Sequence, residues 1–307
     1  MEKKNLYAEI TDRIIKQLEK GTIPWHKPWI IRGDGVGIVS HSTGKGYSLL
    51  NAMLLEEEGE YATFNQIKAE GGNVKNGAKA KPIYFWKQLA VKVTDEKGKP
   101  ILNKDGKPLM KKIPLLKYYS VFNILTDAEN IKPKYYGPSG KEKQAKDSEK
   151  LKIKKAEKVS GDYMKREKLP LRNGMVDSAH YRPSSDSVQV PPITTFEHKE
   201  QYYSTLFHEL THSTGAENRL DRPTMRNYHK DISVRATEEL IAEIGAATSL
   251  MMLGIDTDKS LTNSAAYVKS WLRFLKDDPK MVVTAAGKAE KAVDMIWNIK
   301  HEVKQEA

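Results

Sequence analysis

The residues best suited to chemistry lie in the segment HELTH at positions 208–212, which is an HExxH motif. Residues four apart share one face of a helix, so the imidazoles of His208 and His212 can bind one zinc ion. Glu209 then lies beside the ion, where its carboxylate can take a proton from water. We therefore predict that His208 and His212 are metal ligands and that Glu209 is the catalytic base.

The motif can bind metal only if its segment is helical, and its flanks favour a helix over 195–214. Thr194 and Glu197 have the spacing of a capping box, and Gly215 follows the motif where a C-terminal cap belongs. The residues between them form an apolar stripe on one face: Tyr203, Leu206, Phe207 and Leu210. The alternative is a helix that merely carries two surface histidines.

A zinc site needs a third protein ligand, and the next predicted helix, over 234–253, offers carboxylates. Glu239 and Glu243 are four residues apart and share one helix face. We predict that Glu239 is the ligand and that Glu243 orients one of the histidines through its free N–H. Glu243 as the ligand is the main alternative, and a second is that these acids only complement the helix dipole. Glu238 should point to solvent.

The chain contains no cysteine, so any metal must be held by His, Asp or Glu. We expect Zn²⁺, with another divalent ion such as Mn²⁺ as the alternative. Tyr228 and His229 lie between the two metal helices, where they could stabilise an oxyanion, but we expect them to be loop surface. There is no P-loop and no GxGxxG motif, so nothing indicates nucleotide binding.

The positive charge is concentrated in the N-terminal part of the chain. The 307 residues carry a net charge of +11, with 34 Lys and Arg against 21 Asp and Glu in residues 1–170 and 17 against 19 in the rest. A length near 300 suggests two domains, and such an asymmetry suggests two tasks. The basic part should attract a polyanion, most commonly nucleic acid; the alternative is a lysine-rich solubilising surface.

The apolar periodicity predicts a mixture of helices and strands. In the basic part we expect a helix over 6–18, a short helix from 51 to 55, helix or strand over 61–68, and strands over 81–93 and 118–124 that flank a hairpin extension. In the second part we expect a strand over 186–190, and the two prolines that follow it suit an edge strand or the end of a strand. Helices over 195–214, 234–253 and 263–300, with a break near Pro279, should dominate that part.

Single-stranded nucleic acid is bound by a basic groove with aromatic platforms, because phosphates need cations and bases stack. The basic part offers both kinds of residue in two short segments. For Trp25 and Trp29 the alternative is core packing, and either Phe85 or Trp86 could be an ordinary buried strand residue. The predicted nucleic-acid contacts are Trp25, Lys27, Trp29, Lys75, Lys79, Lys81, Trp86 and Lys87.

Longer patterns carry a resemblance to a known family over nearly the whole chain. IPWHKPW, GYSLLNAMLL, YATFNQIKAEGGNVKNGAKAKPIYFWK and YYSVFNI occur in the first part, and YYSTLFHELTHSTG, RLDR and EELIAEIGAATSL in the second. The chain resembles the ArdC antirestriction family. That resemblance implies an N-terminal domain that binds single-stranded DNA and a C-terminal zincin metallopeptidase-like domain of gluzincin type. It also implies a plasmid, phage or integrative-element protein that shields incoming DNA from host restriction.

These observations predict an α+β protein in three parts. A small α+β domain for single-stranded DNA spans 1–137, and a Lys-rich linker or solvated helix spans 138–168. A mostly helical zincin-like domain with an edge strand spans 169–307. We expect a cytoplasmic protein that makes no membrane contact, with single-stranded DNA and a host or DNA-bound protein as partners. The alternatives are a DNA-shielding protein with a structural or vestigial metal site, a protease for DNA-linked proteins, and a basic part that binds RNA or an acidic protein.

Overall fold

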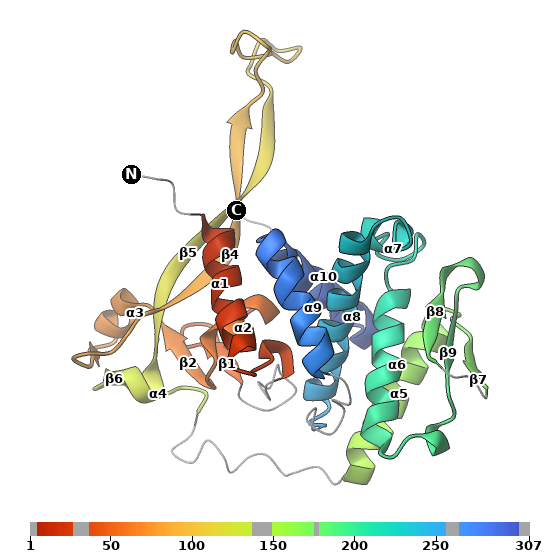
Figure 1. Cartoon of the computed structure of the whole chain (residues 1–307). Helices are drawn as coiled ribbons and strands as arrows, with labels where there is room; N and C mark the ends of the chain where they lie inside the picture. Colours follow the sequence, from red (N-terminus) through yellow and green to blue (C-terminus); the bar gives the residue numbers. More distant parts are fainter. Residues whose placement is uncertain (1–4, 27–36, 137–148, 175–177, 256–263, 301–307) are drawn as a thin grey trace.

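The computed structural model describes residues 5–26, 37–136, 149–174, 178–255 and 264–300, and Figure 1 shows their arrangement. The first part has mixed elements in this order: α1 (Leu6–Glu19), η1 (Pro24–His26), β1 (Ile38–Ser40), α2 (Leu49–Leu55), β2 (Gly59–Ala62), α3 (Phe64–Ala69), β3 (Asn73–Val74), β4 (Lys81–Lys92), β5 (Met110–Asn123), α4 (Ile124–Asp127) and β6 (Ala128–Glu129).

The second part is dominated by helices. Its elements are α5 (Glu149–Arg166), β7 (Leu171–Asn173), β8 (His180–Arg182), η2 (Pro183–Ser185), β9 (Ser187–Val190), η3 (Ile193–Thr195), α6 (Lys199–Ser213), α7 (Pro223–Arg226), α8 (Ile232–Met252), α9 (Ser264–Asp277) and α10 (Met281–Trp297). Together the two parts form the expected α+β fold. In the part of the chain described, no helix is both long and apolar enough to cross a membrane.

A long hairpin of β4 and β5 dominates the sheet of the first part, whose strand order is β1-β2-β5-β4. The two strands pair antiparallel from Lys81 opposite Val121 to Lys92 opposite Met110, and the hairpin projects away from the body (Figure 1). Neither face of its outer part is covered. Phe85 and Trp86 point to opposite faces, yet both are exposed, so neither is the buried strand aromatic of the alternative interpretation.

The sheet of the second part has the strand order β7-β9-β8. Of the two positions that the prolines allow, the structure has the second: β9 pairs parallel with β7 and antiparallel with β8, so it is the central strand and the prolines mark its end. Its two prolines come after the strand, where they remove no ladder hydrogen bond. The edge strands of this sheet are β7 and β8. The helix with the HExxH motif starts later than expected, because His198, not Thr194, is the N-cap of α6.

One apolar core joins the two parts of the chain. Its buried residues come from α1, α2 and Trp25 on one side and from α8, α9 and α10 on the other. Figure 1 accordingly has α1 and α2 beside α9 and α10. Isoleucines 10 and 14 supply the α1 face, and Leu240 and Ile241 supply the α8 face. The two parts therefore share a core. The residue at which one domain ends and the next begins remains a prediction from the sequence.

The Lys-rich segment 138–168 differs from the predicted linker or solvated helix. Its described residues from 149 to 166 form α5, which has a buried face. Ala156 and Tyr163 are fully buried in the second apolar core, and the Tyr163 hydroxyl hydrogen-bonds to Ser213 in α6. The sequence did not predict this face, because apolar residues are few among the many lysines of the helix. The helix α5 is thus packed against the second part of the chain.

The prediction that Trp25 stacks on DNA bases is wrong. Its indole is 0% exposed and lies against Trp271 of α9, with ring centroids 5.2 Å apart and an interplanar angle of 74°. A fully buried ring presents no face to a base, so the core-packing alternative holds. Lys27 and Trp29 lie outside the described residues.

Replacing Trp25 should therefore reduce stability. We expect Trp25→Ala to lower the free energy of unfolding by about 3–5 kcal/mol, because it leaves a cavity in the shared core. Urea denaturation measures the change, and Trp86→Ala on the exposed hairpin is the matched control. Equal loss of stability in both variants would contradict the assignment of Trp25 to the core.

Candidate metal centre

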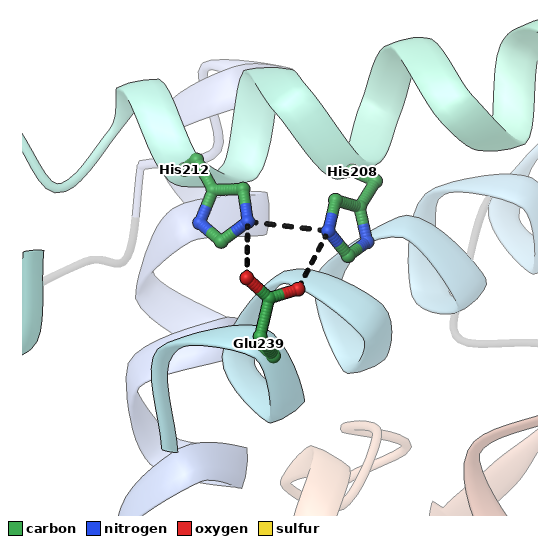
Figure 2. A group of neighbouring side chains, drawn as sticks. All are labelled: His208, His212 and Glu239. Atoms are coloured by element: carbon green, nitrogen blue, oxygen red, sulfur yellow. Dashed lines mark hydrogen bonds and ion pairs between the residues drawn. The ribbon is translucent and has the colours of Figure 1, made fainter. Parts of the chain in front are cut away.

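The candidate site forms where α6 packs directly against α8. Gly245 of α8 allows the close approach, since a Cβ atom there would lie 2.6 Å from the Thr211 hydroxyl oxygen. His208 and His212 project from α6 toward Glu239 of α8, as Figure 2 shows. The ligand atoms of these three residues all lie within 4.8 Å of one another. The helix spacing predicted from the sequence thus brings the three groups together.

The distances between these groups suit a small divalent ion. The two Nε2 atoms are 3.1 Å apart. The Glu239 carboxylate lies 3.4 Å from Nε2 of His208 and 3.8 Å from Nε2 of His212. Tetrahedral zinc with ligand bonds of about 2.0–2.1 Å separates two ligand atoms by about 3.3 Å. Both imidazoles and the carboxylate therefore need only small adjustments to share one ion.

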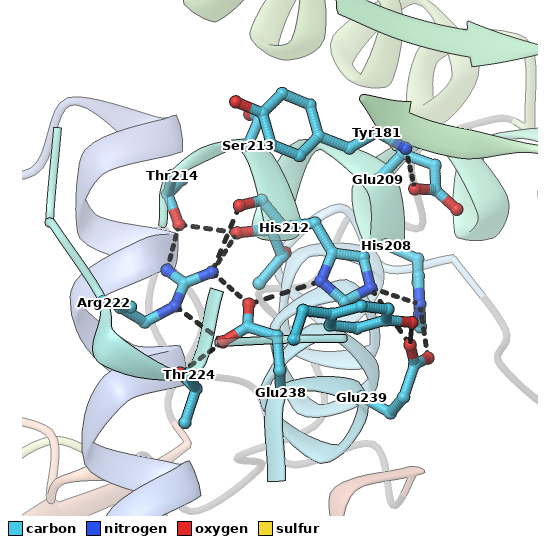
Figure 3. A network of polar contacts seen from close by, with 12 residues as sticks. Tyr181, His208, Glu209, His212, Ser213, Thr214, Arg222, Thr224, Glu238 and Glu239 are labelled. Carbon is cyan, nitrogen blue, oxygen red and sulfur yellow. Dashed lines mark hydrogen bonds and ion pairs between the residues drawn. The ribbon is translucent and has the colours of Figure 1, made fainter. Parts of the chain in front are cut away.

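Each histidine also has a carboxylate on its other ring nitrogen. Nδ1 of His208 lies 3.6 Å from Glu243, which is the orienting contact expected for that residue. Nδ1 of His212 lies 3.3 Å from Glu238 (Figure 3). The prediction that Glu238 points to solvent is wrong, since its side chain is 0% exposed. The His212 contact is a hydrogen bond that orients the ring, and the His208 contact is an ion-pair distance; in both rings the other nitrogen, Nε2, faces Glu239.

Arg222 explains why Glu238 can be buried. Its Nη2 and Nε atoms donate to the two oxygens of Glu238 at 2.6 and 3.1 Å, and the Thr224 hydroxyl adds a third hydrogen bond at 2.6 Å. The guanidinium also donates to the backbone oxygen of Thr211. Gly215 makes room for it, because a Cβ atom there would lie 2.7 Å from Nη2. The charge on Glu238 is therefore paired and hydrogen-bonded.

The site has a strongly negative field that attracts cations. Burial alone would raise the pKa of Glu239, but the hydrogen bond from His208 and the charges of both histidines lower that pKa to about 2. Burial would also raise the pKa values of Glu238 and Glu243. Their hydrogen bonds outweigh the effect of burial and lower both pKa values to about 2. Burial would lower the pKa of His208, yet Glu239 and Glu243 raise it well above its ordinary value. The field that favours a proton here also favours a divalent cation.

Glu209 lies beside the three groups but points toward the edge strand. Its Oε2 atom accepts a hydrogen bond of 2.6 Å from the backbone N–H of Tyr181 in β8 (Figure 3). A cleft of about 490 Å³ opens over the site, lined by Glu209, the three candidate ligands, β8 and Tyr228. An extended chain lying along β8 would therefore pass the candidate centre.

Tyr228 belongs to the site, contrary to our expectation of loop surface. Its hydroxyl donates a hydrogen bond to Glu239, and its ring lies edge-on to that of His212 with centroids 6.0 Å apart. Burial, followed by the hydrogen bond to Glu239, raises the pKa of the tyrosine. The phenol therefore stays neutral, and its single proton is donated to Glu239; if an ion takes over Glu239, the hydroxyl is released to donate to an oxygen in the cleft. His229 lines the same cleft.

The predicted nucleic-acid residues that the structure describes do not form one cluster of free cations. Lys75, Lys79 and Lys87 are exposed. Lys81 is half-buried and pairs with Glu57 at 2.7 Å. Trp86 is 49% exposed and lies 6.1 Å from the ring of Tyr7, at the edge of a groove of about 700 Å³. Lys288 and Lys291 of α10, together with its N-cap Lys280, line the same groove.

Sequence reasoning missed Arg222 and His26. Arg222 was visible as part of RLDR but lay in a loop with no periodicity to orient it. His26 was visible inside IPWHKPW, where the flanking tryptophans drew attention to stacking. Its Nε2 atom lies 3.1 Å from Oε1 of Glu243, so a residue of the first part of the chain reaches the candidate centre.

Comparison with known proteins matches two families to separate parts of the chain. Residues 4–122 match the N-terminal domain of anti-restriction factor ArdC, and residues 159–288 match a zincin-like metallopeptidase family. The second span contains the HExxH motif and the α8 carboxylates. The fold and the site thus define a class: an ArdC-type N-terminal domain joined to a zincin-like metallopeptidase domain.

Solved structures of the antirestriction protein ArdC from plasmid R388 are similar over almost the whole chain. The metal-free structure is 33% identical with a TM-score of 0.69, and the match covers 95% of this chain and 97% of that one. The Mn(II)-bound structure is 31% identical with a TM-score of 0.70, and the match covers 98% and 100%. The chain belongs to the ArdC antirestriction family.

Two curated relatives from Escherichia coli, both called DNA primase TraC, are longer proteins. They are 33% and 32% identical over 99% of this chain. The chain spans only 28% and 20% of their lengths. Most of each relative therefore lies outside the region that matches this chain, and the name describes the whole of that longer protein.

The buried pair of Arg222 and Glu238 gives a stability prediction. We expect Arg222→Met to lower the free energy of unfolding by about 3–5 kcal/mol, because it leaves a buried carboxylate without its partner. Urea denaturation measures the loss. Lys158→Met, which removes an exposed ion pair with Asp162 on α5, is the control and should change little. An Arg222→Met variant as stable as wild type would refute the pairing argument.

Proposed function

We propose that this protein binds single-stranded DNA without strong sequence preference and has a divalent metal site of metallopeptidase type, and that it protects incoming mobile-element DNA from host restriction. The observation that carries the proposal is the convergence of His208, His212 and Glu239 within 4.8 Å on two packed helices. Family membership and the Mn(II)-bound structure of the ArdC protein from plasmid R388 support a divalent ion in a protein of this family. Zn²⁺ is the ion we favour, because two imidazoles and one carboxylate suit it.

Under this proposal the α6 and α8 side chains hold the ion and Glu209 handles the proton. A divalent ion supplies Lewis acidity, which polarises a peptide carbonyl and makes nearby water more acidic. Glu209 takes the proton from the attacking water and passes it to the leaving amine. The Tyr228 hydroxyl stabilises the oxyanion, and β8 holds the substrate chain in an extended conformation. The substrate would be a host protein or a DNA-bound protein.

The DNA-binding part of the proposal rests on charge and on exposed rings. Trp86 has an open ring face beside the lysines of α10, and Phe85 lies on the opposite hairpin face, where Lys87 is its neighbour on the same strand and Lys117 its cross-strand partner. Lys75 and Lys79 extend the basic surface toward the start of β4. Bases stack on such rings and phosphates contact such cations, which gives binding with little sequence preference.

One observation favours a second candidate function, a DNA-shielding protein whose metal site is structural. The carboxylate of Glu209 is buried and accepts the Tyr181 N–H, so it is turned toward β8 and away from Glu239. In that case metal would stabilise the α6–α8 contact and proteolysis would play no part in protection.

Glu209→Gln distinguishes the two candidate functions. We expect the variant to keep its metal, measured by elemental analysis, because Glu209 is not among the three converging groups. It should lose cleavage of an unfolded protein substrate by at least about 100-fold, since a general base contributes about 10²–10⁴-fold.

Restriction protection of transferred DNA is measured in the same variant, with Glu197→Gln as the exposed control. Loss of protection together with cleavage supports the peptidase function. Full protection without cleavage supports the shielding function. A metal-free wild-type protein contradicts both.

Trp86 should contribute to single-strand binding. We expect Trp86→Ala to weaken binding of a short single-stranded DNA by about 1–3 kcal/mol, because it removes a stacking platform. Fluorescence anisotropy measures the affinity. Phe64→Ala, on α3 and also 49% exposed, is the matched control and should have little effect.

The logarithm of the wild-type affinity should fall linearly with the logarithm of the salt concentration. A salt-independent affinity, or an equal effect of both substitutions, would refute this assignment.

A further inference from the structure

The segment that contains His26 lies against the helix that carries the metal-site carboxylates. The short helix η1 packs on α8, and Nε2 of His26 lies 3.1 Å from Oε1 of Glu243. The His26 side chain is only 8% exposed, whereas that of Glu243 is 28% exposed. The His26 side chain is therefore fixed by its buried surroundings, and the Glu243 carboxylate that it contacts is only partly buried.

Neighbouring packing fixes the position of His26. Trp25, the preceding residue, is fully buried against Trp271 and contributes to the core shared by the two parts of the chain. The backbone N–H of His26 donates to the oxygen of Ile23 at 3.0 Å, which closes the η1 turn. The imidazole thus approaches α8 from a rigid anchor, so its contact with Glu243 is built into the fold.

Glu243 uses its two oxygens on two different histidines. Oε1 accepts from His26, while Oε2 lies 3.6 Å from Nδ1 of His208. The other metal-site histidine has an equivalent arrangement, in which Glu238 lies between His212 and Arg222. Each candidate metal ligand on α6 is therefore oriented by a carboxylate, and each carboxylate is held by a further hydrogen-bond donor.

The two outer donors come from different parts of the chain. Arg222 lies within the span 159–288 that matches the zincin-like family, together with the HExxH residues and the α8 carboxylates. His26 lies within the span 4–122 that matches the ArdC N-terminal domain. The zincin-like part alone therefore lacks the donor that holds Glu243.

We propose that His26 is a positioning residue for the metal site, supplied by the N-terminal domain. This inference rests on the proposed metal site. Donation from Nε2–H of His26 fixes the Glu243 carboxylate, which in turn holds the His208 ring with Nε2 directed at the ion. Without His26, Glu243 can rotate toward solvent and His208 loses its fixed orientation.

Metal affinity tests the proposal directly. Removing a residue that orients a metal ligand costs about 10–100-fold in metal affinity, so His26→Leu should weaken Zn²⁺ and Mn²⁺ binding by about 10-fold. Competition with a chromophoric chelator measures both ions. His26→Gln should recover most of the loss, because its side-chain amide can donate at nearly the position of Nε2.

A packing control separates positioning from simple loss of structure. Ile67→Ala removes a fully buried side chain from a separate apolar cluster and leaves the anchor of η1 intact, and urea denaturation of all variants is measured in parallel. We expect Ile67→Ala to lower stability with little change in metal affinity. An equal loss of metal affinity in Ile67→Ala and His26→Leu would overturn the proposal, because general loss of packing would then explain it.

A double-mutant cycle tests whether His26 acts through Glu243. In the Glu243→Gln background, His26→Leu should cause no further loss of metal affinity. Additive losses would overturn the proposal, as would a His26→Leu variant with wild-type metal affinity. These failures differ from failure of the proposed function, in which the wild-type protein itself binds neither ion.

Discussion

The structure depends on the burial of negative charge between two helices. Three carboxylates on less than two turns of α8 face two imidazoles on α6, in a contact that Gly245 makes close enough for ligand distances. Uncompensated carboxylates in this position would oppose folding. Arg222, His26 and Tyr228 each donate to one of the three, so every carboxylate has its own partner and the space between Glu239 and the two Nε2 atoms suits a cation.

The arrangement makes the two parts of the chain interdependent. Buried residues of α1, η1 and α2 share a core with α8, α9 and α10, and His26 reaches into the metal-site network from the same segment. An ArdC-type N-terminal domain and a zincin-like metallopeptidase domain that share a core can influence each other through rigid contacts. The groove beside Trp86 is likewise formed by both parts of the chain, because the ring comes from the hairpin and lysines come from α10.

The sequence predicted the residues that follow helical periodicity and missed those that depend on distant contacts. HExxH spacing and the four-residue separation of Glu239 and Glu243 are properties of single helices, so their faces could be derived. Glu238 was misjudged because its partner Arg222 lies in an irregular loop, where no periodic pattern indicates which way a side chain points. Trp25 was misjudged because an aromatic residue flanked by a cation suits a DNA surface and a core equally well.

Anomalous X-ray diffraction from crystals grown with Mn²⁺ shows whether a divalent ion binds between α6 and α8. We expect one anomalous peak bounded by Nε2 of His208, Nε2 of His212 and the Glu239 carboxylate, with Nδ1 of each histidine still facing Glu243 or Glu238. Diffraction that resolves these side chains but has no peak among them, or a peak held by other residues, would contradict this expectation.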